Sequence, residues 1–440
     1  MEAHAEKSSF RDFGLDESLV EACEKMGLVT PTPIQGDILA QLQRKKDIVA
    51  VSGTGTGKTV AYALPILHHL LKDDKYFYAL VLLPTRELAQ QVHAVFAELG
   101  KEVGLRTSLL IGGVDVVIQG KMLASRPHVI IGTPGRVAHH LKNTKGITLE
   151  TFRYLVLDEC DRLLDGDFEG EVKEVLGLLG DKKNTFLITA TITKRVLQLK
   201  EKLLLKPLHF ETLSSETISP NLLQNYAYLP NRHKEVYLYE IVRKLGISKA
   251  IIFVSTCLGS EKLEKLLTAL GETVCVIHGG KPQGERTAII EGFRAGSKNI
   301  LIATDVVARG IDIPHTKLIL NYDLPETHKD YIHRVGRTAR AGQSGRSITF
   351  VTQYDVQDFQ RLEARISTRM EEYKIDPQAI QELIDTVSAA KRETDAAVKE
   401  EGLGQKLKDL KARKKNPRHG AKSFGGKKGS GSASKKHSRV

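Results

Sequence analysis

One ten-residue stretch, residues 50–59, constrains the fold more than any other part of the chain. It reads Ala-Val-Ser-Gly-Thr-Gly-Thr-Gly-Lys-Thr and lies between a short apolar run and the start of a helical pattern. Strand, small-residue loop, Gly-Lys-Thr and helix form the context of a P-loop, where backbone N–H groups, a helix N-terminus and a lysine bind phosphate. The alternative is a glycine-rich turn with a solvated lysine. We predict a nucleotide-phosphate site formed by Ser52, Gly53, Thr54, Gly55, Thr56, Gly57, Lys58 and Thr59, with the Thr59 hydroxyl facing Mg²⁺.

Apolar runs separated by helical patterns follow the P-loop and predict a parallel sheet, because such strands are buried on both faces. In the first half they span 79–83, 108–111, 128–131, 154–157 and 185–188. After a polar, proline-bearing break, the alternation restarts at 225–229, 250–254, 273–277, 299–303, 317–321 and 347–351. We therefore predict an α/β protein with two tandem domains, each a parallel sheet flanked by helices, without a second P-loop.

The predicted domain boundaries follow from this pattern and from the charge. We expect residues 1–212 to form the nucleotide-binding domain, 213–221 a linker, 222–370 the second domain and 371–402 a helical extension. Residues 403–440 hold 13 Lys/Arg and one acid, whereas the first 402 residues hold 52 basic and 52 acidic groups. This Lys-rich tail, with its Gly/Ser filler, is expected to be disordered because it cannot bury enough apolar surface.

The composition excludes several classes of protein. No apolar stretch reaches the roughly 18 residues that span a bilayer, so no membrane partner is expected. The N-terminus lacks the apolar core of a signal peptide, and an intracellular location is therefore expected. The four cysteines have neither CxxC spacing nor high density, so we expect reduced thiols and no zinc site.

An acidic tetrapeptide, Asp158-Glu159-Cys160-Asp161, follows the apolar run 154–157, which we expect to lie beside the P-loop strand. There Asp158 can hold Mg²⁺, usually through water, opposite Thr59, while Glu159 polarises the attacking water. Taken alone, an acidic cluster after a strand also fits a helix N-cap. With the P-loop upstream we favour half of a hydrolytic site, completed by Lys58.

A basic stretch in the second half, residues 333–340, could supply the other half of that site. Arg337 and Arg340 are three residues apart and would share a face if helical. An arginine supplied to a γ-phosphate raises the rate about 10³–10⁵-fold, and its place on another domain makes hydrolysis depend on closure. The alternative is a solvated basic helix.

Taken together, these motifs resemble those of the DEAD-box RNA helicases over residues 8–370. The resemblance implies two RecA-like domains, ATP and Mg²⁺ as substrate and cofactor, and closure of the domains on RNA. Phe10 and Gln35 resemble the family's Q motif, where the aromatic stacks on adenine and the glutamine reads it. Residues 303–312 resemble the family's fifth motif, in which Asp312 would touch the nucleotide ribose. Arg337 and Arg340 match the family's arginine fingers.

The remaining matches concern RNA binding and coupling between motifs. The residues that match RNA-facing motifs are Pro84, Thr85, Arg86, Gly112, Gly113, Thr133, Pro134, Gly135, Arg136, Gln283, Arg286 and Thr304. Such groups grip phosphates without reading bases, so sequence-independent binding is expected, with 2′-OH contacts favouring RNA. The residues that match interdomain coupling motifs are Asp161, Thr189, Thr191, Asp305, Arg309, Gly310, His333 and Arg334.

Departures from the family pattern leave the chemistry intact. Cys160 stands where Ala is usual, Thr189 where Ser is usual and Val307 where Ala is usual. None of these exchanges removes a group that the reaction needs, so an active ATPase is expected.

Several stretches outside the motifs, among them 127–136, 140–146 and 350–363, resemble the nucleolar members that process 18S ribosomal RNA. The resemblance implies RNA and pre-ribosomal particles as partners, a nuclear, nucleolar location and a monomer. Asp-Glu-Cys-Asp instead resembles the mRNA-export and splicing members, which stays open as an alternative. An ATP-dependent RNA clamp that acts as an assembly platform and a DNA helicase or translocase are further alternatives.

Overall fold

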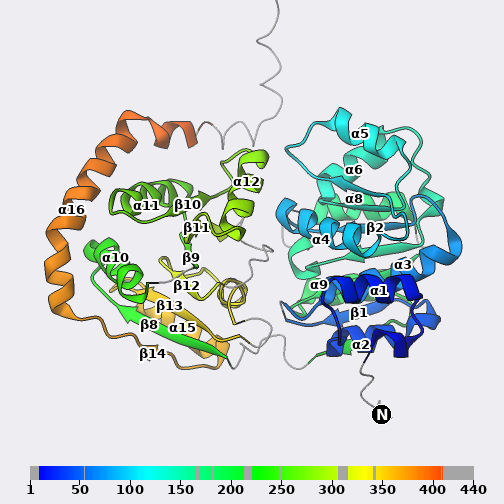
Figure 1. The fold of residues 1–440 in the computed structure, drawn as a ribbon, viewed down its shortest axis with the longest axis horizontal. Helices are drawn as coiled ribbons and strands as arrows, with labels where there is room; N and C mark the ends of the chain where they lie inside the picture. The colour runs from blue at the N-terminus through cyan, green and yellow to red at the C-terminus, as the bar shows by residue number, and fades with distance from the viewer. Residues whose placement is uncertain are drawn as a thin grey trace, which may run out of the picture.

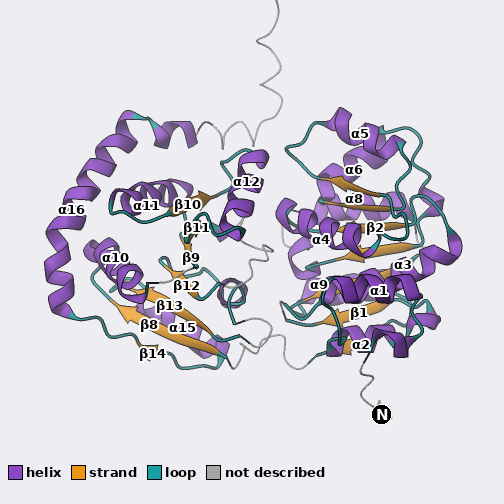
Figure 2. Cartoon of the chain, in the orientation of Figure 1, coloured by secondary structure: helices purple, strands orange, loops and turns teal. Residues whose placement is uncertain are grey.

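The computed structural model describes residues 9–53, 55–164, 168–180, 183–212, 221–246, 249–305, 316–339, 343–407 and 409. Figure 1 shows two α/β bodies side by side, and Figure 2 shows that each has strands at its centre and helices around them. The predicted pair of parallel sheets is confirmed. Within the described part of the chain, no helix has the length and apolarity that crossing a bilayer requires.

The first sheet has seven parallel strands in the order β3-β4-β2-β5-β6-β1-β7. Its strands are β1 (Ile48–Val51), β2 (Ala79–Leu82), β3 (Thr107–Leu110), β4 (Val129–Gly132), β5 (Tyr154–Leu157), β6 (Asn184–Thr189) and β7 (Leu208–Glu211). Its helices are α1 (Glu17–Lys25), α2 (Pro33–Leu39), α3 (Lys58–Asp73), α4 (Arg86–Leu99), α5 (Val116–Ala124), α6 (Pro134–Asn143), α7 (Cys160–Leu163), α8 (Glu169–Leu179) and α9 (Lys194–Leu203).

The second sheet also has seven parallel strands, in the order β10-β11-β9-β12-β13-β8-β14. They are β8 (Leu222–Tyr228), β9 (Ala250–Phe253), β10 (Val274–Ile277), β11 (Ile300–Ala303), β12 (Leu318–Asn321), β13 (Gly345–Val351) and β14 (Glu371–Glu372). The helices are α10 (Lys234–Leu245), α11 (Cys257–Ala269), α12 (Gln283–Arg294), α14 (His328–Val335), α15 (Val356–Ile366) and α16 (Pro377–Glu400). Short 3₁₀ helices span Phe10–Phe13, Leu42–Arg44, Leu149–Thr151 and Asn231–His233.

The strands are apolar on both faces because helices cover both sides of each sheet. Along β1, Ile48 and Ala50 pack into one core, whereas Val49 and Val51 pack into the core on the opposite face. This alternation follows from the two-residue repeat of a strand. The continuous apolar runs in the sequence were therefore a valid guide to the buried strands.

Three details differ from the sequence predictions. The β5 strand does not lie beside β1, because β6 pairs with both of them and separates them. The edge strands β7 and β14 were not predicted; β7 alternates between half-buried and exposed residues and β14 has only two residues, so neither forms a continuous apolar run. Residues 403–407 are helical, so the predicted disordered tail cannot begin at 403. The helix α16 runs along the outer side of the second body (Figure 1).

Candidate ATP and RNA site

The P-loop joins β1 to the long buried helix α3. Gly57 adopts φ +83°, and a Cβ there would lie 2.4 Å from Gln35 Nε2, so glycine is required. Lys58 Nζ donates to the carbonyl oxygens of Ser52 and Gly53, each at 2.7 Å. The loop therefore holds its lysine at the N-terminus of α3, where the helix dipole also favours an anion. Thr54 lies outside the described residues.

The Q-motif residues contact the P-loop directly. Thr32 Oγ1 donates to the Thr56 carbonyl at 2.7 Å, and Gln35 Nε2 donates to the Gly57 carbonyl at 3.1 Å. The Phe10 ring is 2% exposed and belongs to the apolar core. Gln35 thus braces the phosphate loop, while the reading of adenine by Gln35 and Phe10 stays a prediction.

Asp158 lies at the carboxyl end of β5, with a 4% exposed side chain. Its Oδ2 accepts a hydrogen bond from Tyr62 Oη at 3.0 Å and its Oδ1 accepts one from the Glu159 N–H at 2.9 Å. Burial raises the pKa of Asp158 to about 6, although Lys58 opposes that rise. Asp158 therefore reaches the P-loop helix even though its strand is not adjacent to β1.

The donor set around Asp158 fits Mg²⁺. A carboxylate and the Thr59 hydroxyl are hard oxygen ligands, which Mg²⁺ prefers. Among the described residues, no three His, Cys, Asp or Glu side chains gather into a metal cluster. Mg²⁺ commonly takes one or two protein ligands and completes its shell with water and phosphate oxygens.

Glu159 occupies a strained position at the turn between β5 and α7. Its φ of 49° is left-handed, which is uncommon for a residue with a side chain. Its carboxylate is buried, 3.6 Å from Arg162 Nε, and its Oε2 accepts no hydrogen bond from the described residues. A carboxylate oxygen next to Asp158 that is ion-paired with Arg162 but accepts no hydrogen bond from the described residues has the chemistry required to orient an attacking water.

The residues matched to the coupling motif after β6 bind the acidic turn. Thr191 Oγ1 donates to Asp161 Oδ2 at 2.7 Å, and Thr189 Oγ1 donates to the Thr191 carbonyl at 2.8 Å. Burial raises the pKa of Asp161, which the Thr191 hydrogen bond opposes. A movement of the Asp161 side chain would therefore act directly on Thr191 through this hydrogen bond.

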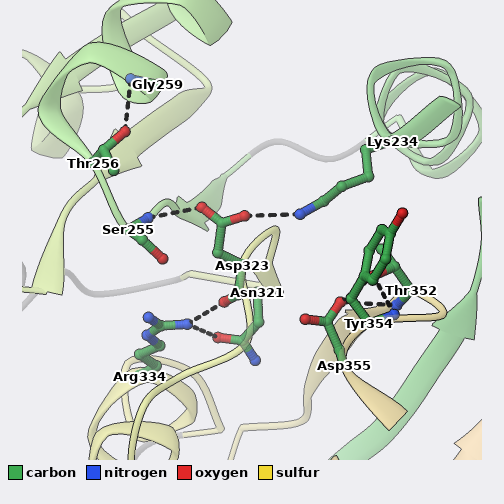
Figure 3. A network of polar contacts seen from close by, with 10 residues as sticks. All are labelled: Lys234, Ser255, Thr256, Gly259, Asn321, Asp323, Arg334, Thr352, Tyr354 and Asp355. Carbon is green, nitrogen blue, oxygen red and sulfur yellow. Dashed lines mark hydrogen bonds and ion pairs between the residues drawn. The ribbon is translucent and has the colours of Figure 1, made fainter. Parts of the chain in front are cut away.

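In the second domain, Arg334 is the centre of a network of polar contacts. It binds both carboxylate oxygens of Asp305, at 2.7 and 2.6 Å, and donates to Asn321 Oδ1 at 3.2 Å and the Asp323 carbonyl at 2.7 Å. Figure 3 shows that the Asp323 carboxylate in turn accepts from Lys234 Nζ and the Ser255 N–H. The described partners of Arg334 and Asp305 lie within one domain, and their interdomain role stays a prediction.

The condition set for the arginine pair, that both lie on one helix, is not met by Arg337. The helix α14 ends at Val335, so Arg337 lies beyond it, 4% exposed, with Nε donating to the His333 carbonyl at 3.1 Å. The C-cap residue Gly336 has φ −65°, and its N–H is hydrogen-bonded to the carbonyl oxygens of Arg334 and Ile332. Arg309, Gly310, Asp312 and Arg340 lie outside the described residues.

A cavity of about 1130 Å³ is lined by both domains. Asp161 and Arg162 of the first domain line it together with Asp323 and His333 of the second. The cavity brings Asp161 and His333, predicted to couple the domains, to the same space.

The residues matched to RNA-binding motifs also meet across the two domains. Glu87 Oε1 accepts from Gln283 Nε2 at 3.0 Å and from Arg286 Nη2 at 2.5 Å. Arg86 Nη1 lies 3.5 Å from Gln283 Oε1 and packs against Gly112 and Gly113 so closely that a Cβ on either would clash with its guanidinium. One surface therefore holds residues of α4, the Gly-Gly turn and α12.

The N-terminus of α6, in the first domain, carries further residues that match RNA-binding motifs. The Gly135 N–H is hydrogen-bonded to Glu171 of α8, and Arg136 Nη1 donates to the Val114 carbonyl at 2.7 Å. Pro134 is buried and fills the N1 position of α6, as expected for proline. In the other domain, Thr304 is 5% exposed and its Oγ1 has no partner among the described residues.

Sequence reasoning missed Tyr62 and Glu87. Tyr62 is four residues after Lys58, one helical turn further along α3, and this spacing was a usable signal. Glu87 directly follows the predicted RNA-binding residue Arg86 but was assigned no role, because its partners Gln283 and Arg286 are almost 200 residues away in sequence. No local pattern could have found them.

A P-loop domain with a buried acidic turn, joined to a second parallel-sheet domain that presents arginines, defines a two-domain RecA-like ATPase of the helicase type. Residues 32–199 match the family model described as DEAD/DEAH box helicase, and residues 233–342 match that of the helicase conserved C-terminal domain. The chain belongs to the DEAD-box ATP-dependent RNA helicases.

Curated relatives and solved structures agree with this assignment. The chain is 41% identical over 392 residues to the Schizosaccharomyces pombe "ATP-dependent rRNA helicase rrp3", covering 89% of this chain and 84% of that protein. It is 42% identical to the Drosophila melanogaster "ATP-dependent RNA helicase DDX47", covering 90% and 78%. The S. cerevisiae Dbp5 structure bound to RNA and ADP BeF3 superposes with a TM-score of 0.76 at 29% identity, covering 87% and 100%. Mss116p bound to ssRNA and AMP-PNP gives a TM-score of 0.78 at 27% identity, covering 88% and 84%.

Proposed function

We propose that this RNA-dependent ATPase remodels short RNA duplexes in ribosomal RNA processing, within pre-ribosomal particles of the small subunit. Its rrp3-type relatives are named rRNA helicases, which supports this substrate. A nuclear, nucleolar location and a monomeric state are part of the same proposal, and the RNA-bound Dbp5 and Mss116p structures support RNA as the partner.

The observation that carries the mechanism is the contact of Glu87 with Gln283 and Arg286, since it joins RNA-motif residues of both domains. RNA bound across this surface would hold the domains together. Closure would bring Arg337 toward the γ-phosphate held by Lys58, as it places Asp161 and His333 around one cavity. RNA binding and ATP hydrolysis would then depend on the same domain arrangement.

In the hydrolytic step, Glu159 orients a water molecule that attacks the γ-phosphorus, and the bond to the β,γ-bridging oxygen breaks to give ADP and phosphate. Thr59 and Asp158 would hold Mg²⁺, which neutralises charge on the phosphate oxygens. Lys58 and the P-loop N–H groups stabilise the charge that moves to the leaving ADP. Release of phosphate would allow the domains to open.

The deciding experiment compares ATP hydrolysis alone, with single-stranded RNA and with DNA of equal length. Strong stimulation by RNA alone supports RNA-gated closure. Equal rates under all three conditions would contradict it and favour a partner-driven clamp. Duplex-release rates measured against the lifetime of the RNA complex separate unwinding from clamping.

The alternative in mRNA export or splicing was suggested by Cys160. In the structure Cys160 is fully buried and packs in the apolar core behind the sheet. A small buried side chain of this kind is a matter of packing and carries no information on the RNA substrate. We therefore keep ribosomal RNA processing as the proposal.

A further inference from the structure

The Tyr62 hydroxyl lies between the two residues that are proposed to hold Mg²⁺. Tyr62 is fully buried on α3, one turn beyond Lys58 and Thr59, and donates to Asp158 Oδ2 at 3.0 Å. The Thr59 side chain is within hydrogen-bonding reach of the same hydroxyl. A single phenol group therefore links the P-loop helix to the acidic turn after β5.

Two hydrogen bonds from different elements fix the orientation of the Asp158 carboxylate. Oδ1 is held by the Glu159 N–H at 2.9 Å, from the turn itself, and Oδ2 is held by Tyr62, from α3. With one bond to each oxygen, rotation of the carboxylate is restrained, and each oxygen keeps a lone pair for a metal-bound water. Without the Tyr62 hydroxyl, only the Glu159 hydrogen bond would remain among the described partners.

Packing alone requires the ring of Tyr62 but not its hydroxyl. The ring lies 6.2 Å from the Phe96 ring in an apolar core that a phenylalanine would fill equally well. A buried hydroxyl needs a hydrogen-bond partner, and its partner here is the proposed metal ligand. Groups in this outer position commonly orient metal ligands and tune metal affinity.

We infer that Tyr62 is a positioning residue that orients Asp158 and Thr59 for Mg²⁺, so that its hydroxyl sets the affinity for the Mg²⁺–nucleotide complex. This inference rests on the proposed ATPase site. It assigns to Tyr62 no contact with the nucleotide.

The test compares the full chain with the Tyr62→Phe variant by titration of a fluorescent ADP analogue, first in EDTA and then at graded Mg²⁺. In EDTA, the two proteins should bind the ADP analogue with equal affinity. The Mg²⁺ concentration that produces half of the gain in affinity should be about 10-fold higher for Tyr62→Phe. A change of about 10-fold is the lower end of the effect that loss of a ligand-orienting group has on metal affinity. Electron paramagnetic resonance of Mn²⁺ with the ADP complex should show the same loss directly.

The matched control is Tyr154→Phe. Tyr154 is equally buried in the same domain, but its hydroxyl lies 2.6 Å from His69 Nδ1, away from the phosphate site. It should retain the wild-type Mg²⁺ dependence. Thermal melts followed by circular dichroism show where each variant begins to unfold. All titrations are made below that temperature.

Two outcomes would overturn the inference. An unchanged Mg²⁺ dependence in Tyr62→Phe would show that the hydroxyl has no influence on the metal ligands. An equal loss of affinity with and without Mg²⁺ would show that it maintains the P-loop and not the metal ligands. Absence of any nucleotide binding by the wild-type chain would instead contradict the proposed function.

Discussion

Glu87 of α4 and Arg286 of α12 form an ion pair of 2.5 Å between the two domains. Both side chains are almost completely buried, at 1% and 6% exposure. Burial lowers the pKa of Arg286, although Glu87 opposes this. Loss of one member would leave the other charged group buried without its partner, which commonly costs about 3–5 kcal/mol. The arrangement with both domains in contact should therefore depend strongly on this pair.

Arg286→Ala tests that dependence. We expect RNA-stimulated ATP hydrolysis to fall at least about 10-fold, because the substitution removes a charged group that joins the domains. Nucleotide binding by the P-loop should not change. Steady-state ATPase assays with and without RNA, together with fluorescent ADP titration, measure the two effects.

Arg294→Ala is the matched control, since Arg294 lies at the other end of α12. It should retain RNA stimulation. If Arg286→Ala were stimulated as well as the wild type, the Glu87 ion pair would not belong to the RNA-competent arrangement.

Glu159→Gln should separate binding from hydrolysis. The amide keeps the size of the side chain but is a poor base, so turnover should fall about 10²–10⁴-fold, the usual contribution of general base catalysis. ATP and RNA should still bind, because the P-loop and the contacts of Glu87 with Gln283 and Arg286 are unaltered. Single-turnover hydrolysis and RNA anisotropy with ATP present measure both. Normal turnover by this variant would remove Glu159 from its assigned role.

The alternation of apolar runs and helical patterns was enough to predict both parallel sheets. Continuous apolar runs such as Tyr154–Leu157 mark strands buried on both faces. These runs do not reveal the order of the strands in the sheet. The prediction that β5 lies next to β1 was therefore wrong. Order in a sheet depends on which crossover each helix makes, and β6, which comes later in the chain, inserts between them.

The phosphate site was predictable because its residues are contiguous and chemically specific. Lys58 and Thr59 begin α3 as the Gly-Lys-Thr pattern requires. Other parts of the site depend on tertiary contacts. The Glu87–Arg286 pair joins distant segments, and α14 ends at Val335, two residues before Arg337.

His69 should make the first domain sensitive to acid. Its side chain is 4% exposed, stacks on Tyr154 and lies 2.6 Å from the tyrosine hydroxyl, and burial lowers its pKa to about 4. The unfolded chain binds this proton near pH 6.5. Between about pH 6.5 and 4 the unfolded state is therefore the more protonated, so stability falls as pH falls, by at most about 1.4 kcal/mol per unit.

His69→Asn removes the titrating group and keeps a side-chain amide that can contact the Tyr154 hydroxyl. Urea midpoints measured from pH 7.5 to 5 should decline less steeply for the variant than for the wild type. His140, whose pKa burial also lowers to about 4, titrates in both proteins and so cancels in the comparison. Parallel curves for variant and wild type would contradict the role of His69.

The basic C-terminal residues should add RNA affinity that depends on salt. Residues 410–440 hold 11 Lys/Arg and no acid. The helical residues before them approach the second domain, with Leu407 close against Gly280, three residues before the RNA-motif residue Gln283. Deletion of 410–440 therefore tests the tail, whereas deletion from 403 would also remove this packing.

RNA affinity of the shortened chain should fall most at low salt. For each phosphate that the tail no longer engages, the slope of log affinity against log salt should become shallower by about 0.7, and the two proteins should converge as salt screens the charges. Anisotropy titrations of one single-stranded RNA over a range of salt concentrations measure the slope. A full-length chain with the Lys/Arg of 410–440 changed to Gln is the control for length, and should match the deletion because charge alone is responsible. An unchanged slope in both would show that the tail does not bind RNA.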